Sequence, residues 1–114
     1  MNFQQKLASY VLGILKDSDL IDIAETAIEE GFKNKKLEIV ASLPKTEYSS
    51  VIQDFFKRAL QELNLRFPDI ETAFKIMLDY YTEEMRKKQI SVNDGINIIE
   101  RLILYKLDEK ENLK

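Results

Sequence analysis

Apolar residues recur every three or four positions between Phe67 and Leu107, which is the spacing that places side chains on one face of an α-helix. In this segment the apolar positions are Ile70, Ala73, Phe74, Met77, Leu78, Tyr81, Met85, Ile96, Ile99, Leu102, Ile103, Tyr105 and Leu107. The pattern is interrupted at residues 87–91, and so short a link favours antiparallel packing of the helices that it joins. The sequence therefore predicts two long amphipathic helices packed as an antiparallel C-terminal helical hairpin.

Both predicted helices have recognisable beginnings. Asp69 follows Pro68 and can accept hydrogen bonds from the free amides of the first helical turn. Ser91 begins the second helix, and Asp94 three residues on resembles the acidic member of a capping box. Gly95 lies in the first turn, where Gly costs up to about 1 kcal/mol relative to Ala, and a close helix crossing would explain it. The apolar stripe of the second helix is wide enough to contact two neighbouring elements.

The first half of the chain repeats the helical spacing in four shorter stretches, over about residues 3–16, 20–30, 34–43 and 46–64. The residues that end or begin these stretches are Asp17–Asp19, Gly31, Asn34, Pro44 and Thr46. No segment alternates apolar and polar residues with a period of two, so a sheet is not expected. We predict an all-α protein, with a single compact array of five to six helices over residues 1–107 and a polar C-terminal tail at residues 108–114.

Length and composition fit this architecture. A chain of 114 residues with 45% hydrophobic and 32% charged residues is typical of one globular domain. No apolar run approaches the ~20 residues that a membrane span requires, and the N-terminus lacks a signal-peptide pattern. We expect a cytoplasmic protein without a membrane partner.

The chain contains no Cys and no His. Disulfides, thiolate ligands and cysteine nucleophiles are thereby excluded, together with the commonest general base and the commonest metal ligand. No catalytic, metal or nucleotide motif is present in the sequence. We therefore predict a non-enzymatic protein with no cofactor, no metal site and no catalytic residues.

Residues 17–30 carry six acidic residues and no basic residue, which is a local charge of −6. Such a block can complement a basic partner, because complementary charge guides protein association. The leading hypothesis is accordingly a protein–protein interaction domain of the immunity or antitoxin type. The acidic residues assigned to its partner surface are Asp19, Asp22, Glu25 and Glu29.

A second candidate surface involves two adjacent aromatic residues. Tyr80 and Tyr81 point about 100° apart on a helix and cannot both face the same core. Tyr80 is therefore predicted to be partly exposed and to form, with Phe56, Tyr105 and Met85, an apolar patch for a protein partner or for self-association. In the alternative interpretation the helix stripes are wide enough for all of these aromatic residues to pack inside the monomer.

The acidic region also permits a helix-turn-helix interpretation. The spacing is that of the Ala, the turn Gly and the two apolar anchors of that motif, at Ala27, Gly31, Leu37 and Val40. The residues at the start of the recognition helix would be Asn34, Lys35 and Lys36. The net charge of −3 and the acids of the preceding helix oppose binding to phosphate, so nucleic acid is the less favoured partner.

A third interpretation is a Mg²⁺-dependent all-helical nucleotide hydrolase. Glu25 lies one helical turn from both Asp22 and Glu29, and hard cations take carboxylate ligands. A hydrolase of this kind needs a second acidic pair on a facing helix. The residues that could supply it are Asp54, Glu62, Asp79 and Glu83, and the last two fall on the predicted solvent face.

Three pieces of the chain together form a pattern of small residues, leucines and helix breaks. They are Gly31 with Leu37 and Val40-Ala41, the run Ala59-Leu60-Gln61-Glu62-Leu63-Asn64-Leu65 followed by Pro68, and the segment Ile90-Ser91-Val92-Asn93-Asp94-Gly95. In these pieces the chain resembles a group of small, all-helical, uncharacterised bacterial proteins. The resemblance implies an all-helical fold and rests on folding residues, so it transfers no functional residue to this chain.

Overall fold

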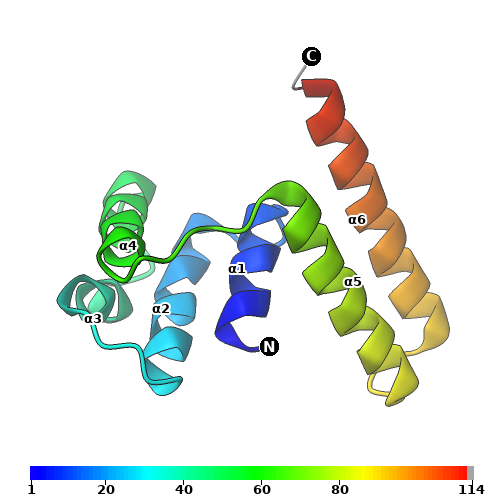
Figure 1. Ribbon diagram of the computed structural model, residues 1–114, viewed down its shortest axis with the longest axis horizontal. Helices are drawn as coiled ribbons and strands as arrows, with labels where there is room; N and C mark the ends of the chain where they lie inside the picture. Colours follow the sequence, from blue (N-terminus) through cyan, green and yellow to red (C-terminus); the bar gives the residue numbers. More distant parts are fainter. Residues whose placement is uncertain (113–114) are drawn as a thin grey trace.

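The computed structural model describes residues 1–112, which form an all-α protein without strands (Figure 1). The elements are α1 (Phe3–Val11), the short 3₁₀ helix η1 (Asp17–Asp19), α2 (Leu20–Glu29), α3 (Lys35–Ser42), α4 (Ser49–Glu62), α5 (Ile70–Arg86) and α6 (Val92–Asn112). The predicted fold class is confirmed. Helix α6 continues through Asn112, into the segment predicted to be a polar tail, and residues 113–114 lie outside the described part of the chain.

Helix α1 lies in the middle of the molecule, with α2, α3 and α4 on one side and the α5–α6 pair on the other (Figure 1). It packs against α2 and against α5, while α3 packs against both α2 and α4. Helices α5 and α6 run side by side in opposite directions, as predicted for the C-terminal hairpin. The hairpin therefore meets the rest of the protein mainly through the contact between α1 and α5.

The apolar residues form two separate cores. The larger core lies among α1, α2, α3 and α4, and Ile23, Leu37 and Phe56 are among its fully buried side chains. The smaller core lies among α1, α5 and α6 and contains Ala8, Leu12, Ala73, Met77 and Leu102. Helix α1 joins them, because its consecutive residues Leu7 and Ala8 belong to the first and the second core respectively.

The hairpin begins as its sequence predicts. The carboxylate of Asp69 accepts a hydrogen bond from the Thr72 amide at 2.7 Å and caps α5. The Ser91 hydroxyl accepts one from the Asp94 amide at 3.1 Å at the start of α6. Both satisfy amides that have no partner within the helix, so both helix starts are specified locally.

Two predicted boundaries are wrong. Helix α1 ends at Val11 rather than near residue 16, because Gly13 adopts a positive φ of +76° that ends the helical turn. Gly13 also lies against Tyr105 of α6, whose Cε2 atom would be 3.0 Å from an added Cβ. Helix α4 begins at Ser49, and the residue at its N-cap position is Tyr48 rather than Thr46.

The close helix crossing expected at Gly95 is confirmed. A Cβ atom added to this residue would lie 2.2 Å from the sulfur of Met85 on α5. Because no real Cβ tolerates such a distance, Gly at this position lets the two helices approach closely near the link that joins them.

Candidate interaction surfaces

The acidic segment at residues 17–30 is partly used by the fold itself. Asp22 forms an ion pair with Lys6 of α1 at 2.8 Å, and Glu30 accepts a hydrogen bond from the Phe3 amide at 2.6 Å. Glu25 and Glu29 are exposed and form no hydrogen bond or ion pair within the described residues. Of the four acids assigned to a partner surface, Glu25 and Glu29 thus remain available, while Asp22 helps to hold α1 to α2.

Asp19 has a local role. Its carboxylate accepts a hydrogen bond from the Lys16 amide at 2.7 Å, at the start of η1. This contact fixes the turn between α1 and α2, and the carboxylate is only partly exposed. Asp19 therefore has a structural role that Glu25 and Glu29 do not share, and it is also distant from them along the chain.

A polar cluster around Asp17 ties three elements together. Its carboxylate accepts hydrogen bonds from Gln53 of α4 and from the Tyr10 hydroxyl of α1, both at 2.7 Å. These two bonds hold the pKa of Asp17 below its usual range. Burial, together with the bond to the Asp17 carboxylate, raises the pKa of Tyr10 to about 12. The cluster has a structural role that is sufficient to explain its residues.

The residues of the helix-turn-helix interpretation are drawn into the contact between α3 and α4. Asn34 caps α3, accepting a hydrogen bond from the Lys36 amide at 2.9 Å, and its amide nitrogen donates to Glu62 at 2.9 Å. The Lys36 ammonium forms an ion pair with the same Glu62 carboxylate. Hydrogen bonds from Lys36 and Asn34 lower the pKa of Glu62. Lys35 is exposed, and it is the one residue of the three that this contact leaves available to a ligand.

The carboxylates of the Mg²⁺ interpretation do not converge. Among the described side chains, no three His, Cys, Asp or Glu residues form a group that could hold a metal ion. Asp54 pairs with Arg58 at 3.2 Å, and Glu62 is engaged by Lys36 and Asn34. The second acidic pair that this chemistry requires is therefore not brought opposite Glu25.

Phe56 does not belong to any surface patch, and its assignment to a partner surface is wrong. Its side chain is 0% exposed and packs in the larger core, with its ring centroid 5.8 Å from that of Phe67. Helix α4 is covered by α2, α3 and η1, so a wider part of its surface is buried than the sequence indicated. Phe56 thus cannot join Tyr80, which lies on α5.

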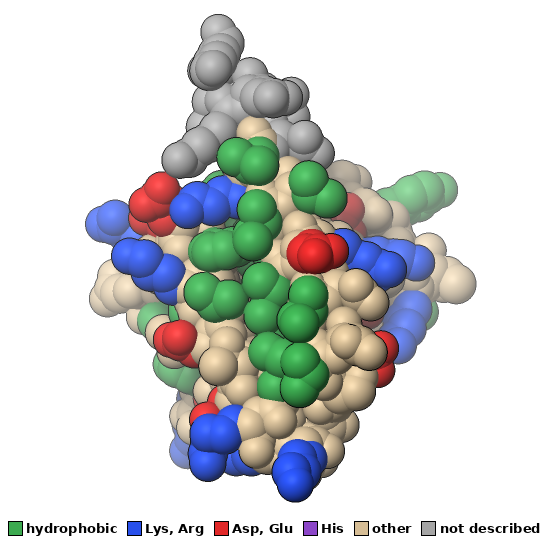
Figure 2. All heavy atoms as spheres, turned by 90° about the vertical axis from the view of Figure 1, so that its right-hand side faces the viewer, with side chains coloured by type: hydrophobic (Ala, Val, Ile, Leu, Met, Phe, Trp, Pro, Cys, Tyr) green, Lys and Arg blue, Asp and Glu red, His purple; other side chains and the backbone are tan. Residues whose placement is uncertain are grey.

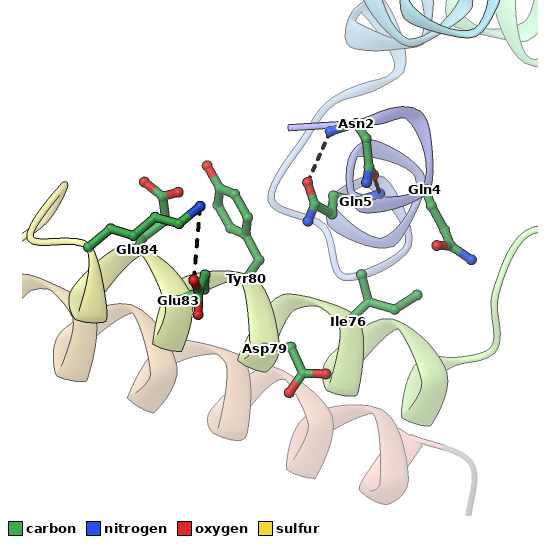
Figure 3. A pocket seen from close by; sticks show the side chains of 9 residues that line it. Asn2, Gln4, Gln5, Ile76, Asp79, Tyr80, Glu83 and Glu84 are labelled. Carbon is green, nitrogen blue, oxygen red and sulfur yellow. Dashed lines mark hydrogen bonds and ion pairs between the residues drawn. The ribbon is translucent and has the colours of Figure 1, made fainter. Parts of the chain in front are cut away.

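Tyr80 is half-buried and lines a cleft of about 600 Å³ between α5 and the start of α1. Figure 3 shows its ring between Glu84 of α5 on one side and Gln5 of α1 on the other. Burial, and to a lesser extent the charge of Glu84, raises the pKa of Tyr80. The carboxylate of Glu83 is bound by Arg86 and lies 3.9 Å from the Lys87 ammonium. The cleft is polar and wide, and the positive charges of Arg86 and Lys87 offset part of the negative charge of its acidic residues.

Among the side chains that the structure describes, a row of exposed apolar residues follows α6. Val92, Ile96, Ile99, Ile103 and Leu107 follow one another along the helix at intervals of three or four residues, and we call these five residues the α6 stripe. Val92 is 61% exposed, Ile96, Ile103 and Leu107 are also exposed, and Ile99 is half-buried. Figure 2 shows a continuous column of apolar side chains along this face of the molecule.

The stripe is exposed because α6 has one neighbour along its length. Helix α5 covers Leu102 and the residues around it. Tyr105 also contacts the end of α1, where its hydroxyl donates a hydrogen bond to the Val11 carbonyl at 3.0 Å. The sequence predicted a stripe wide enough for two neighbours, and within the described residues the second neighbour is missing along the outer face. Sequence reasoning did not identify this surface, although the width of the stripe was the signal for it.

Comparison with models of known protein families, with curated proteins and with solved structures finds no significant match. The resemblance to small helical bacterial proteins therefore stays a hypothesis. Within residues 1–112, none of the helices combines the length and the apolar composition that a membrane crossing requires.

Proposed function

We propose that this protein is a non-enzymatic protein–protein interaction domain whose contact surface is the α6 stripe. The observation that carries the proposal is the exposure of four aliphatic side chains of the stripe along one helix face. Single exposed apolar residues are normal on protein surfaces, but a contiguous row usually marks an interaction site. The rest of the described surface supports this choice, because its exposed large apolar residues, such as Ile39 and Tyr48, are scattered.

The spacing of the stripe supports a protein ligand. Intervals of four, three, four and four residues approximate the repeat by which one α-helix packs along another. A small molecule needs a concave site, whereas a helix face is convex and suits a second extended surface. The proposed ligand is therefore a helix or helical face of a protein.

The acidic residues are compatible with a basic partner, but the choice of α6 as the contact surface does not depend on them. Glu25 and Glu29 on α2 remain available for a basic partner of the immunity or antitoxin type, and they lie on the other side of α1 from α6. A partner that used both surfaces would have to reach around the molecule. We therefore assign the contact to α6, and a cytoplasmic location, expected from the sequence, completes the proposal.

The absence of Cys from the natural sequence permits a direct test. Ile103→Cys places a single thiol on the stripe, and Asn97→Cys places one on an exposed position of the same helix outside the stripe. In cells that express the protein at its natural level, we expect a thiol-alkylating reagent to modify Asn97→Cys quickly and Ile103→Cys slowly, because a partner covers the stripe. In dilute purified protein both should react quickly. Equal reactivity of the two thiols in cells would contradict the proposal.

A further inference from the structure

The α6 stripe has a shape that restricts what can cover it. From Val92 to Leu107 it spans 15 residue steps, which is about 22 Å at the helical rise of about 1.5 Å per residue. Its side chains project from a single convex helix, so the complementary surface is a helix whose apolar residues have the same spacing. This chain carries such a helix itself.

Resting on the proposed function, we infer that the occupant of the α6 stripe is a second copy of this chain, and that two molecules pair through their stripes as a closed homodimer. Pairing of one patch with the same patch on the partner is the arrangement of a two-fold dimer. A head-to-tail contact would need a different apolar patch to receive the stripe. Outside α6, the exposed large apolar residues of the described surface are Met1, Ile14, Ile39 and Tyr48, which do not form a row comparable with the stripe; Ile14 lines a pocket beside Ile98 and Tyr105 of α6.

The size of the stripe suits a dimer interface. The exposed side chains of the stripe present on the order of 400 Å² of apolar surface. Two copies would then bury on the order of 800 Å² of apolar surface, and homodimer interfaces are about 65% apolar by area. The complete contact would be about 1,200 Å², which lies at the lower end of the usual range for specific protein interfaces.

The charges near the stripe favour a protein surface over a lipid surface. Through Leu107, α6 carries two acidic residues, Asp94 and Glu100, and two basic residues, Arg101 and Lys106, so its net charge is zero. Lys106 is directed toward α5, where its ammonium lies 3.8 Å from the Glu71 carboxylate and 4.8 Å from the Phe74 ring centroid. Helices that lie on anionic membranes carry an excess of Lys and Arg on the polar face, and α6 lacks that excess.

Sedimentation velocity of the purified protein tests the inference over about 1 μM to about 1 mM, a range that brackets the Kd of small interfaces. The wild type should change with concentration from 13.4 kDa to twice that mass. The single variants I96K and I103K should each raise the Kd at least ~100-fold, since a buried unpaired ammonium opposes association. Asn97→Lys adds one charge to the same helix outside the stripe and should leave the Kd within about threefold.

A second measurement does not depend on charged variants. A spin label on Ile103→Cys should show a defined distance to the label of the second copy, in a fraction of molecules that grows with concentration. The same label on Asn97→Cys should show a longer distance, because this residue lies outside the stripe.

The outcomes separate the two proposals. A wild type that stays monomeric at all concentrations, a larger oligomer, or dimerisation unaffected by I96K and I103K would overturn the homodimer. If the protein stays monomeric while Ile103→Cys is protected in cells, the stripe binds a different protein and the interaction function stands. If neither dimer nor protection is observed, both proposals fail.

Discussion

The helices on the two sides of α1 differ in how completely the monomer covers them. On one side, α2, α3 and α4 enclose a core with several neighbours for each helix, and Phe56 loses all contact with solvent. On the other side, α5 lies between α1 and α6, and α6 packs mainly against α5, with Tyr105 reaching the end of α1. Helices with similar amphipathic patterns therefore have their apolar faces buried in one region and partly exposed in the other.

The polar contacts show the same contrast. In the region formed by α1 through α4, ion pairs and hydrogen bonds join different elements. Examples are the ion pair between Lys6 and Asp22 and the hydrogen bond from Gln53 to Asp17. In the hairpin, the ion pair that joins the two helices within the described residues is that of Lys106 with Glu71, at 3.8 Å, and pairs of this kind at the surface contribute little to stability. Stability is expected to reside mainly in the first region, and the surface available for recognition in the second.

The largest effect expected from this contrast is the loss of the Phe56 ring. Phe56→Ala should lower the free energy of unfolding by about 3–5 kcal/mol, because the ring is 0% exposed and its removal leaves a cavity. Urea denaturation followed by circular dichroism measures this change. Tyr48→Ala is the matched aromatic control, since Tyr48 is 78% exposed, and it should change stability by less than about 0.5 kcal/mol. Similar losses for the two variants would break the assignment of the core to this region.

A smaller effect is expected at the helix crossing of the hairpin. Gly95→Ala should destabilise the protein by about 1 kcal/mol, since the added methyl group displaces the Met85 side chain. In a Met85→Ala background the same substitution should instead stabilise by up to about 1 kcal/mol, because Ala is the better helix former. A double-mutant cycle measured by thermal unfolding gives the coupling directly. Additive effects of the two substitutions would mean that the helices are not in close contact at this point.

The smallest effect concerns pH and the Asp17 cluster. The pKa of Asp17 is lowered in the folded protein, so its carboxylate stabilises the fold at pH values above its ordinary pKa of 3.8, and this contribution is lost as pH falls through the folded value. Asp17→Asn should therefore lower stability at pH 7 by less than about 1 kcal/mol, as solvent screens a partly exposed group.

Urea midpoints measured from pH 7 down to acid check this prediction. The difference between wild type and Asp17→Asn should shrink below pH 3.8. Glu25→Gln removes a carboxylate that has no partner within the described residues and should leave the midpoint unchanged at pH 7. A constant difference for Asp17→Asn at all pH values would show that the charge of Asp17 is not what stabilises the cluster.

The sequence by itself determined the helices and most of their ends. The spacing of apolar residues, the caps at Asn34, Asp69 and Ser91, and the Gly95 crossing depend on residues close in the chain or on the short link of the hairpin, and each is confirmed. The exceptions are the end of α1 and the start of α4. There, Gly13 packs against the distant Tyr105, and no side chain caps the first turn of α4.

Only the tertiary structure decided which apolar faces are covered and which acids are engaged. The three-and-four spacing shows that a helix has an apolar face, but it carries no information on how many neighbours will lie against that face. Phe56 was for this reason assigned to a surface patch, with packing inside the monomer as the alternative, and it is buried, whereas Ile96 and Ile103 were expected in a covered stripe and are exposed. Asp22 and Glu25 look alike in the sequence, and the ion pair with Lys6 that distinguishes them exists because folding brings α1 beside α2.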